Sequence, residues 1–316
     1  MNKYYEVAGK ALKHYGFENV TLTYLTEETN VIYQVTTDQQ RYVLKIFEEA
    51  SSCYEDNMAE AYLLDLLEST SLKYPRLVKT KEHESVLKVY CEEESRFKRL
   101  MMYEWMEGVD YETHETYDYF EELGEVMAQM HQATSDVILP PHIKPKKWDR
   151  VFFYKDEIPV YHMDRYKDHV SDNTKKIMNQ VILILNERLK SIYETKTPQL
   201  IHGDLNPWNI KINEGKLHLI DYEEALFGFP EHDLATLLYY YQVHETLDYE
   251  QVKSAFIKGY RKFNTTHMFE EKTLQTLMIS RRVNFMNYVL TIRENPKEFI
   301  EYSVTFVKRY IESYGG

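Results

Sequence analysis

Residues 201–210 read IHGDLNPWNI, and the triplet LID follows at residues 219–221. Within these segments, oxygen-bearing side chains stand at Asp204, Asn209 and Asp221. Phosphoryl transfer needs a group that orients the acceptor hydroxyl and takes its proton, together with metal that neutralises the phosphates. We predict Asp204 as that catalytic base. We predict Asn209 and Asp221 as ligands of Mg²⁺, which prefers oxygen donors and few protein ligands.

The residues between the two predicted metal ligands have the pattern of a β-hairpin. Alternating apolar residues occupy 209–212 and 217–220, and Asn213, Glu214 and Gly215 separate them as a turn. Such a hairpin returns the second predicted ligand to the neighbourhood of the first, as a shared metal requires. The alternative is a polar loop whose Asp and Asn side chains only satisfy backbone turns. The complete set of residues, with apolar flanks on both sides, favours the metal site.

The run HGDLNPWNI, followed by Ile-Asp-Tyr, resembles the catalytic loop and metal-binding segment of the aminoglycoside phosphotransferase and choline kinase family, relatives of the protein kinases. This resemblance implies an α+β, two-lobed, protein-kinase-like fold. The small N-terminal lobe is expected to hold an antiparallel sheet and a helix, and the larger C-terminal lobe to be mainly helical. By the same resemblance His202 organises the loop. The family's Asp-Leu-Ala is matched at 233–235, so Asp233 is expected to brace the catalytic loop; the alternative is a helix N-terminal acid favoured by the dipole.

The kinase interpretation requires a lysine on a strand and a glutamate on the next helix. Residues 41–47 read RYVLKIF, a strand pattern in which Lys45 is flanked by apolar residues. A lysine in such surroundings needs a partner charge or a bound phosphate, unless it lies on an exposed edge strand. Helical periodicity over residues 56–68 places Glu60 beside an apolar stripe. We therefore predict that Lys45 pairs with Glu60 at the nucleotide phosphates.

The turn between the first two predicted strands reads TEETN at residues 26–30 and contains no glycine. Protein kinases cover the phosphates at this place with a glycine-rich loop whose backbone approaches closely. Here Thr26, Thr29 and Asn30 have to substitute for it. The missing glycines argue against a protein kinase more than against a kinase.

Residues 100–108 read LMMYEWMEG, which is similar to the family's last small-lobe strand and the hinge that follows it. Kinases of this shape bind adenine through hinge backbone groups between apolar walls. We predict that the backbones of Glu104 and Met106 make these contacts.

A chain of 316 residues exceeds the size at which a single core usually keeps growing, so two lobes are expected. We predict a nucleotide-binding lobe at 1–103, a hinge at 104–108, and a catalytic and substrate-binding lobe at 109–316 with an insertion at 140–169. Hydrophobic periodicity predicts strands at 20–25, 31–36 and 42–47, and helices at 119–133, 173–193, 231–241, 249–263, 271–290 and 296–314.

The net charge of −13 argues against nucleic acid or an anionic membrane as the main partner. The chain has no run of 18 apolar residues and no apolar signal region at its start, so we expect a cytoplasmic location. The two cysteines, Cys53 and Cys91, have no metal-binding spacing.

The acceptor substrate is indicated only by composition. Residues 104–122 contain eight acidic residues and no lysine or arginine, which suits a cationic acceptor if they face it. The alternative is a solvated acidic surface. The predicted insertion is rich in aromatic residues and is either an acceptor wall or an ordinary connection.

Taken together, these features predict an ATP-dependent phosphotransferase that acts on a hydroxyl of a small molecule: an aminoglycoside-like compound, an amino alcohol or a sugar. ATP, or GTP in its place, and Mg²⁺ are the expected cofactors, and the oligomeric state is left open. Two alternatives are a bacterial Ser/Thr protein kinase of the same fold and a non-catalytic kinase-like binding protein. The joint presence of Lys45, Asp204, Asn209 and Asp221 argues against the last, because a binding protein has no chemical need for all four.

Overall fold

The structure, a computed structural model, describes residues 4–154 and 157–315. Backbone contacts divide the chain into two compact units. The first contains the residues up to Glu115, with Gln132–Pro145 and Pro207–Ala225. The second contains Thr116–His131, Lys146–Asn206 and the residues from Leu226 on. The predicted lobe and hinge boundaries stay a prediction, and their residues 1–3, 155–156 and 316 lie outside the described part.

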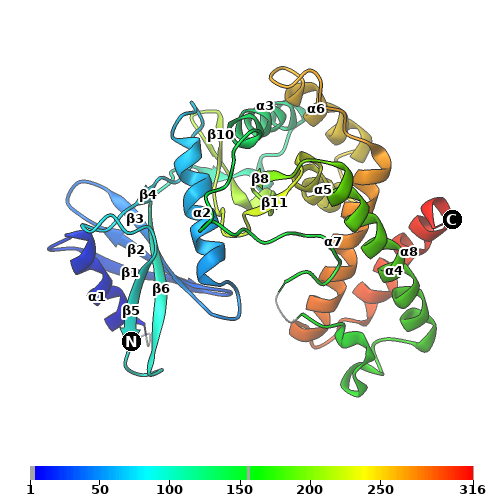
Figure 1. The fold of residues 1–316 in the computed structure, drawn as a ribbon, viewed down its shortest axis with the longest axis horizontal. Coiled ribbons are helices and arrows are strands. Elements are labelled where there is room, and N and C mark those ends of the chain that lie inside the picture. Colours follow the sequence, from blue (N-terminus) through cyan, green and yellow to red (C-terminus); the bar gives the residue numbers. More distant parts are fainter. Residues whose placement is uncertain (1–3, 155–156, 316) are drawn as a thin grey trace. The chain divides into compact units, whose positions relative to one another are not determined.

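An antiparallel sheet forms the centre of the first unit (Figure 1). Its strands follow the order β1-β2-β3-β6-β4, and β5 also pairs with β6. The strands are β1 (Thr21–Glu27), β2 (Val31–Thr36), β3 (Arg41–Phe47), β4 (Leu77–Val78), β5 (Leu87–Cys91) and β6 (Arg96–Glu104). The three strands predicted from periodicity are therefore confirmed. The α+β fold class is confirmed as well, since the second unit is mainly helical.

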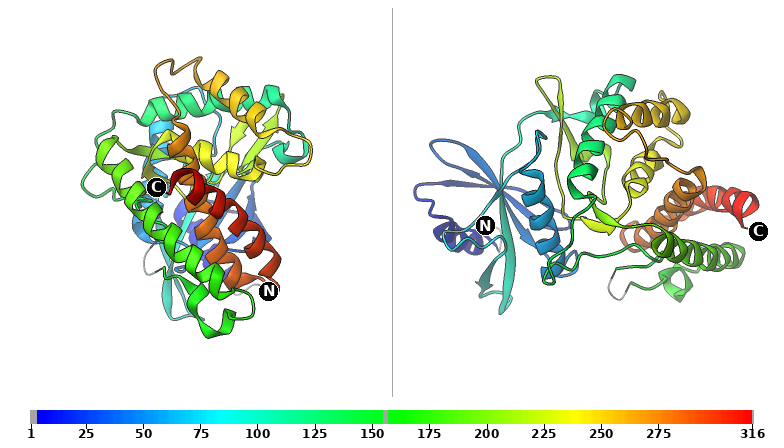
Figure 2. Two further views of the ribbon diagram at one scale, coloured as in Figure 1. Left: turned by 90° about the vertical axis from the view of Figure 1, so that its right-hand side faces the viewer. Right: turned by 45° about the horizontal axis from the view of Figure 1, so that its top comes forward.

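Two helices cover the two faces of this sheet. Helix α1 (Tyr5–Tyr15) packs on the face that carries the alternate buried residues of β2 and β3, among them Val35 and Leu44. Helix α2 (Tyr54–Leu67) lies on the opposite side, as Figures 1 and 2 both show. Because side chains alternate along a strand, Lys45 points to the face opposite Leu44. The helix predicted at 56–68 is confirmed as α2.

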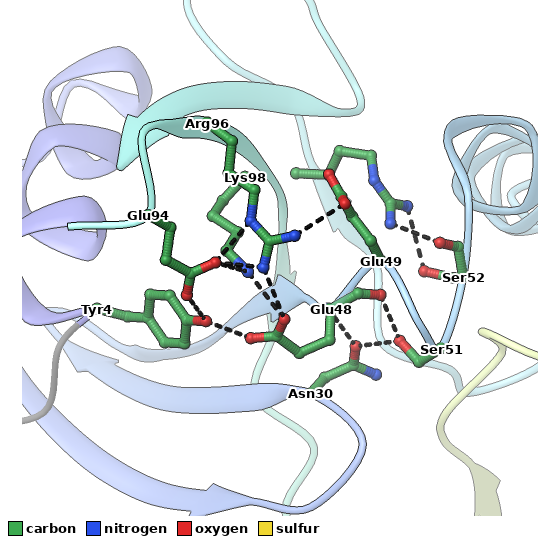
Figure 3. Close-up of polar contacts among 10 residues, drawn as sticks. Tyr4, Asn30, Glu48, Glu49, Ser51, Ser52, Glu94, Arg96 and Lys98 are labelled. Carbon is green, nitrogen blue, oxygen red and sulfur yellow. Dashed lines mark hydrogen bonds and ion pairs between the residues drawn. The ribbon is translucent and has the colours of Figure 1, made fainter. Parts of the chain in front are cut away.

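Charged residues of β6 fix the connection from β3 to α2. The buried Lys98 ion-pairs with Glu48 at 2.8 Å, and Arg99 donates a hydrogen bond to the carbonyl of Ser52 at 2.6 Å. The side-chain oxygen of Asn30 accepts from the backbone N–H of Glu48 at 3.1 Å (Figure 3). The connection that follows the lysine strand is therefore held at both its ends by side chains from neighbouring strands.

The predicted hairpin is also present in the first unit. Its strands are β9 (Ile210–Asn213) and β10 (Lys216–Leu219), and the short helix η4 (Pro207–Asn209) precedes them. Strand β9 also pairs with β7 (Val109–Asp110), which leads into η1 (Tyr111–Thr113). The turn residues Glu214 and Gly215 both have positive φ, 51° and 72°. This is the geometry of a two-residue type I′ turn, which glycine accommodates without strain.

The second unit is built around α7, which contacts α4, α5 and α8. Figure 2 shows α4, α7 and α8 running side by side. Its elements are α3 (Tyr117–Thr134, whose last residues belong to the first unit), η2 (Val160–His162), η3 (Asp164–Tyr166), α4 (Asp172–Thr195), β8 (Gln199–Ile201), β11 (Leu226–Gly228), α5 (Pro230–Tyr241), α6 (Tyr249–Tyr260), α7 (Glu271–Ile292) and α8 (Lys297–Tyr314). All six predicted helices are confirmed.

Local sequence explains where these helices begin and how closely they pack. Pro230 is the first residue of α5, a position where its missing N–H costs nothing. The ring nitrogen Nδ1 of His232 accepts from the backbone N–H of Phe229 at 3.0 Å and caps the same helix. Helices α3 and α6 approach so closely that a Cβ at Gly259 would lie 1.8 Å from the carbonyl oxygen of Glu121. Among the described residues, no helix is both long and apolar enough to cross a membrane.

Candidate active site

A cavity of about 340 Å³ opens in the first unit, within the range of small-ligand pockets. Its walls are mainly apolar, and charged residues stand along part of its lining. The apolar part includes Leu25, Ile32, Val43, Pro75, Met106 and Ile220, and the polar part includes Lys45, Glu60, Glu104, Lys211 and Asp221. Such a cavity suits a flat aromatic ring attached to a charged group.

Lys45 makes two ion pairs at the charged side of this cavity. Its Nζ lies 2.7 Å from Asp221 Oδ1 and 2.9 Å from Glu223 Oε2. Burial alone would lower the pKa of Lys45. The carboxylates of Asp221, Glu223 and Glu60 more than offset this, so that the pKa lies well above its ordinary value. Lys45 therefore carries a positive charge in the lining of the cavity, and Asp221 belongs to the same lining.

The structure shows no direct ion pair between Lys45 and Glu60, both described residues, and their pairing at the nucleotide phosphates stays a prediction. Glu60 instead accepts a hydrogen bond from the hydroxyl of Tyr103 at 2.8 Å. Burial raises the pKa of its carboxyl to about 8, against the opposing attraction of Lys45. Lys45 donates to Asp221 and Glu223, while the buried Glu60 carboxyl is held by Tyr103. Glu60 still lines the cavity, and its contact with the nucleotide stays a prediction.

The loop predicted to meet the phosphates divides into exposed and buried parts. Thr26 and Thr29 are exposed and are not among the residues that line the cavity. Asn30 is buried, and its Nδ2 donates to Glu223 Oε2 at 2.7 Å. Since its Oδ1 accepts from Glu48 and Ser51, Asn30 joins this carboxylate to the connection after β3. The phosphate contacts of these three residues stay a prediction.

Some backbone N–H groups where β6 ends are already hydrogen-bonded within the protein. The N–H of Glu104 already donates to Arg76 O at 2.8 Å, and that of Trp105 donates to Arg41 O at 3.2 Å. The N–H of Met106 makes no hydrogen bond within the described part of the chain. The predicted adenine contacts therefore reduce to the carbonyl of Glu104 and the N–H of Met106.

The hairpin places the two predicted metal ligands at one end of the same two strands. Ile220 N–H donates to the carbonyl of Asn209 at 2.9 Å, directly before Asp221. Asp221 has a φ of 62°, a left-handed conformation that Asp tolerates better than most residues and that is frequent at functional sites. An amide oxygen and a carboxylate are hard donors, which fits Mg²⁺ held by few protein ligands together with phosphates. Their metal binding stays a prediction.

The predicted base, Asp204, belongs to the second unit. Its Oδ1 accepts from Arg281 Nη2 at 2.9 Å, and its Oδ2 accepts from Asn206 Nδ2 at 2.7 Å. Its backbone N–H donates to Nδ1 of the buried His202 at 3.3 Å. The carboxylate is thus held at both oxygens by neighbouring side chains.

Asp233, at the start of α5, contacts the residues just before this base. Its Oδ1 accepts from the N–H of Gly203 at 2.8 Å, and its Oδ2 accepts from the N–H of His202 at 3.2 Å. His131 Nε2 lies 2.9 Å from the same Oδ2, and its Nδ1 lies 3.0 Å from Tyr260 Oη. Burial alone would raise the pKa of Asp233, but these partners lower it. The contacts are those that the predicted brace requires, and its effect on activity stays a prediction.

A family model, described as the phosphotransferase enzyme family, matches residues 23–264, which include Lys45, Asp204, Asn209, Asp221 and Asp233. The chain belongs to this family. It is therefore a phosphotransferase, and the family resemblance noted in its motifs is confirmed.

Three relatives show how far the similarity extends. The amicoumacin kinase of Bacillus subtilis (strain 168) is 23% identical over 279 residues, which are 82% of this chain and 76% of that protein. A solved structure of the amicoumacin kinase hAmiN in complex with AMP-PNP, Ca²⁺ and Ami aligns with a TM-score of 0.78 and 20% identity, covering 99% of this chain and 95% of that one. A microcompartment-associated aminopropanol kinase aligns with a TM-score of 0.74 and 18% identity, covering 98% of both chains. These structures share the fold of the phosphotransferase.

The acidic stretch of the phosphotransferase is partly neutralised by its own basic residues. Glu107 pairs with Arg41, and Asp110 pairs with Lys211. Glu121 pairs with Lys258 at 2.5 Å. These three acids carry ion pairs on the protein surface, which favours the solvated-surface alternative for them over a role at a cationic acceptor.

The predicted insertion at 140–169 is divided between the two units, and its part from Lys146 on is held to α7 where it is described. Trp148 stacks on Phe153 with ring centroids 4.7 Å apart. Asn284 of α7 donates to both oxygens of Glu157 at 3.0 Å, and Asn287 donates to the carbonyl of Ile158 at 2.9 Å. A role in acceptor binding stays a prediction, and residues 155–156 lie outside the described part.

Two residues around the predicted site were not found from the sequence. Glu223 follows Asp221 by two positions and lies in a turn, and the sequence gave no signal that both carboxylates reach Lys45. Arg281 lies in α7 and is remote in sequence from Asp204. A charged residue at a buried position of a helix is the one signal that could have marked it.

Proposed function

We propose that this phosphotransferase transfers the γ-phosphoryl group of ATP to a hydroxyl of a small molecule, with Mg²⁺ as its metal cofactor. The main support is the ion-paired Lys45 with Asp221 and Glu223 at the charged side of an apolar cavity. The apolar walls suit adenine, and the lysine with the carboxylates suits a metal-bound polyphosphate. The named kinases among the relatives support the same chemistry.

Binding of nucleotide rearranges the charges around Lys45 in this proposal. The lysine turns from the two carboxylates to the phosphate oxygens, to which an ammonium donates strong charge-assisted hydrogen bonds. Asp221 and Asn209 would hold Mg²⁺, which would neutralise the phosphate charge when bound. Glu104 and Met106 orient the adenine through the carbonyl and the N–H left available.

Asp204 acts on the acceptor. The acceptor O–H bond breaks as its oxygen forms a bond to the γ-phosphorus, the bond from that phosphorus to the bridging β-γ oxygen breaks, and ADP leaves. The proton passes to the Asp204 carboxylate, which orients the hydroxyl beforehand. His202 and Asp233 hold the loop that carries this carboxylate.

The acceptor is an amino alcohol in the first instance, because one structural relative is named as an aminopropanol kinase. A protein hydroxyl is the alternative acceptor, and a binding protein without turnover is the further alternative. The missing glycines at residues 26–30 weigh against a protein kinase. ATP is preferred over GTP as donor because one relative binds AMP-PNP.

The proposal is tested by ATP consumption by the purified chain with Mg²⁺ and each of four acceptors: an amino alcohol, an aminoglycoside, a sugar and a generic protein. We expect turnover with a small molecule and a higher melting temperature in the presence of Mg²⁺ and ATP, since a ligand that binds only the folded state stabilises it. Turnover with the protein alone would favour the protein kinase. No turnover and no thermal shift would leave only the binding protein.

A further inference from the structure

An arginine of α7 links three groups at the predicted catalytic loop. Arg281 Nη2 lies 2.9 Å from Asp204 Oδ1, 3.1 Å from Asn206 Oδ1 and 3.1 Å from Tyr240 Oη. Its side chain is only 16% exposed. Each of these contacts lies within the second unit.

The contacts close a ring around the carboxylate of the predicted base. Arg281 binds one oxygen of Asp204, while Asn206 donates to the other at 2.7 Å and itself accepts from Arg281. A carboxylate has about four lone-pair positions on its two oxygens, and the ring uses one on each oxygen. The ring therefore fixes the orientation of the carboxylate.

The arginine itself is anchored to the packed helices. Tyr240 lies in α5, which packs on α7, so its hydroxyl holds the guanidinium from a second helix. Burial raises the pKa of Tyr240, which keeps the hydroxyl neutral. Burial alone would lower the pKa of Arg281, but Tyr240 and Asp204 raise it, so the guanidinium stays charged. The ring thus connects a loop residue to two helices of the core.

We propose that Arg281 is a positioning residue that holds the Asp204 carboxylate in the orientation needed to accept the acceptor proton. This inference rests on the proposed function of Asp204. A base on a loop loses efficiency when its orientation is free, because a misplacement of about 1 Å can cost on the order of 100-fold in rate. The Nη2 atom that makes these contacts belongs to a rigid planar guanidinium, which supplies this restraint better than an ammonium on a flexible stem does.

The competing explanation is that Arg281 only supports the fold. Its neighbour Arg282 provides a control, because it lies in the same helix, is buried and also has its guanidinium over the ring of Tyr239. Arg282 donates to Gln242 Oε1 at 2.5 Å and makes no hydrogen bond to Asp204 within the described residues. Loss of either arginine removes a buried guanidinium from one helix, and only one of them touches the predicted base.

The test measures kcat, the KM for ATP and the melting temperature of Arg281→Met and Arg282→Met. We expect roughly 10- to 100-fold lower kcat for Arg281→Met with an unchanged KM for ATP. Arg282→Met should lower the melting temperature and leave kcat within about twofold. If Arg281→Met does not fold, Arg281→Lys keeps the charge and should still lower kcat. Equal losses of kcat in Arg281→Met and Arg282→Met would overturn the inference.

A double variant separates this inference from the proposed function. If Arg281 acts through Asp204, then adding Arg281→Met to Asp204→Asn lowers the residual kcat by less than about twofold, since groups that act as a unit are not additive. The full single-variant loss in the Asp204→Asn background would overturn the positioning role while the base assignment stands. Full turnover by Asp204→Asn alone, or no turnover of the wild type with any acceptor including water, would overturn the base assignment and this inference together.

Discussion

The charge centres of the two units are built in opposite ways. In the first unit, Lys45 shares its charge among carboxylates that are near one another, and one of them, Glu60, has its pKa raised to about 8. In the second unit, Asp204 and Asp233 each have several donors around one carboxylate. Several carboxylates around one lysine suit a site whose ligand binds together with metal cations. An excess of donors around one acid suits a group that must keep a fixed orientation.

The largest effect is expected from removing the acid at the centre of the second unit. Asp204→Asn should lower kcat by roughly 10²- to 10⁴-fold, the usual contribution of a general base. The thermal shift by Mg²⁺ and ATP should be kept, because the predicted nucleotide contacts belong to the first unit. Loss of the thermal shift in this variant would show that the two centres do not have separate tasks.

The next prediction concerns how the stability of the protein depends on pH through the acidic residues around Lys45. Because its pKa is raised, the Glu60 carboxyl of the folded protein keeps its proton up to about pH 8. In the unfolded chain the same carboxyl releases the proton near its ordinary pKa of 4.5. This contribution to stability is present below pH 4.5 and is lost as the pH rises to about 8. It amounts to on the order of 5 kcal/mol at most, since one pKa unit equals about 1.4 kcal/mol.

Glu60→Gln keeps the shape of the side chain and removes the titration. The melting temperature of this variant, relative to that of the wild type, should therefore increase as the pH rises from 4.5 to 8. The exposed Glu68→Gln in the same region of the chain is the control and should follow the wild type. Parallel curves for Glu60→Gln and wild type would contradict the neutral, buried state of Glu60.

The second unit should respond to pH in the opposite direction. Burial lowers the pKa of His232 to about 4. The unfolded chain therefore binds a proton below about pH 6.5 that the folded chain refuses, and stability is lost as the pH falls from 6.5 to 4. The loss is on the order of 3 kcal/mol at most.

His232→Gln should reduce this loss, because glutamine can replace the histidine as a helix cap and does not titrate. Unfolding in denaturant at pH 4.5 and pH 7 measures the difference for both proteins. An identical loss of stability in the variant would assign the acid sensitivity to other groups.

Removing the lysine of the first unit is expected to have a smaller effect on activity than removing the base. Lys45→Met should lower kcat/KM for ATP by roughly 10- to 100-fold, the equivalent of one strong hydrogen bond to a charged group. Lys88→Met removes an exposed lysine from β5 of the same sheet and should leave kcat/KM unchanged. Equal values for Lys45→Met and wild type would remove the lysine from the nucleotide site.

The smallest effect concerns one backbone donor of the cavity. Met106→Pro removes the N–H that is left available, and should raise the KM for ATP by roughly 2- to 10-fold, the value of one hydrogen bond. Met106→Leu keeps the N–H and should behave as wild type. The same increase of KM in both variants would assign the effect to the side chain instead.

The elements around the site were predictable because their signals are local. The turn at Glu214 and Gly215 follows from residues that tolerate positive φ between two alternating segments. The strand that carries Lys45 follows from period-two alternation, and α2 from the helical period. The catalytic loop could be predicted because its residues are close in the sequence.

The partners of these residues could not be predicted in the same way. Periodicity placed Glu60 on the correct helix and did not show that Glu223 and Asp221 lie closer to Lys45. Helical periodicity also predicted α7, but the pattern cannot show which buried arginine reaches Asp204. Such pairings depend on how separate elements pack, which a local pattern does not contain.

By itself, the sequence determined the reaction class, the positions of the predicted base and metal ligands, and the order of the elements. These depend on short spacings and on repeats of two or 3.6 residues, which the chain carries locally. Only the tertiary structure decided which carboxylates surround Lys45, that Asn30 binds Glu223 and that Arg281 holds Asp204. Those contacts join residues up to 193 positions apart, and only packing of the core brings such residues together.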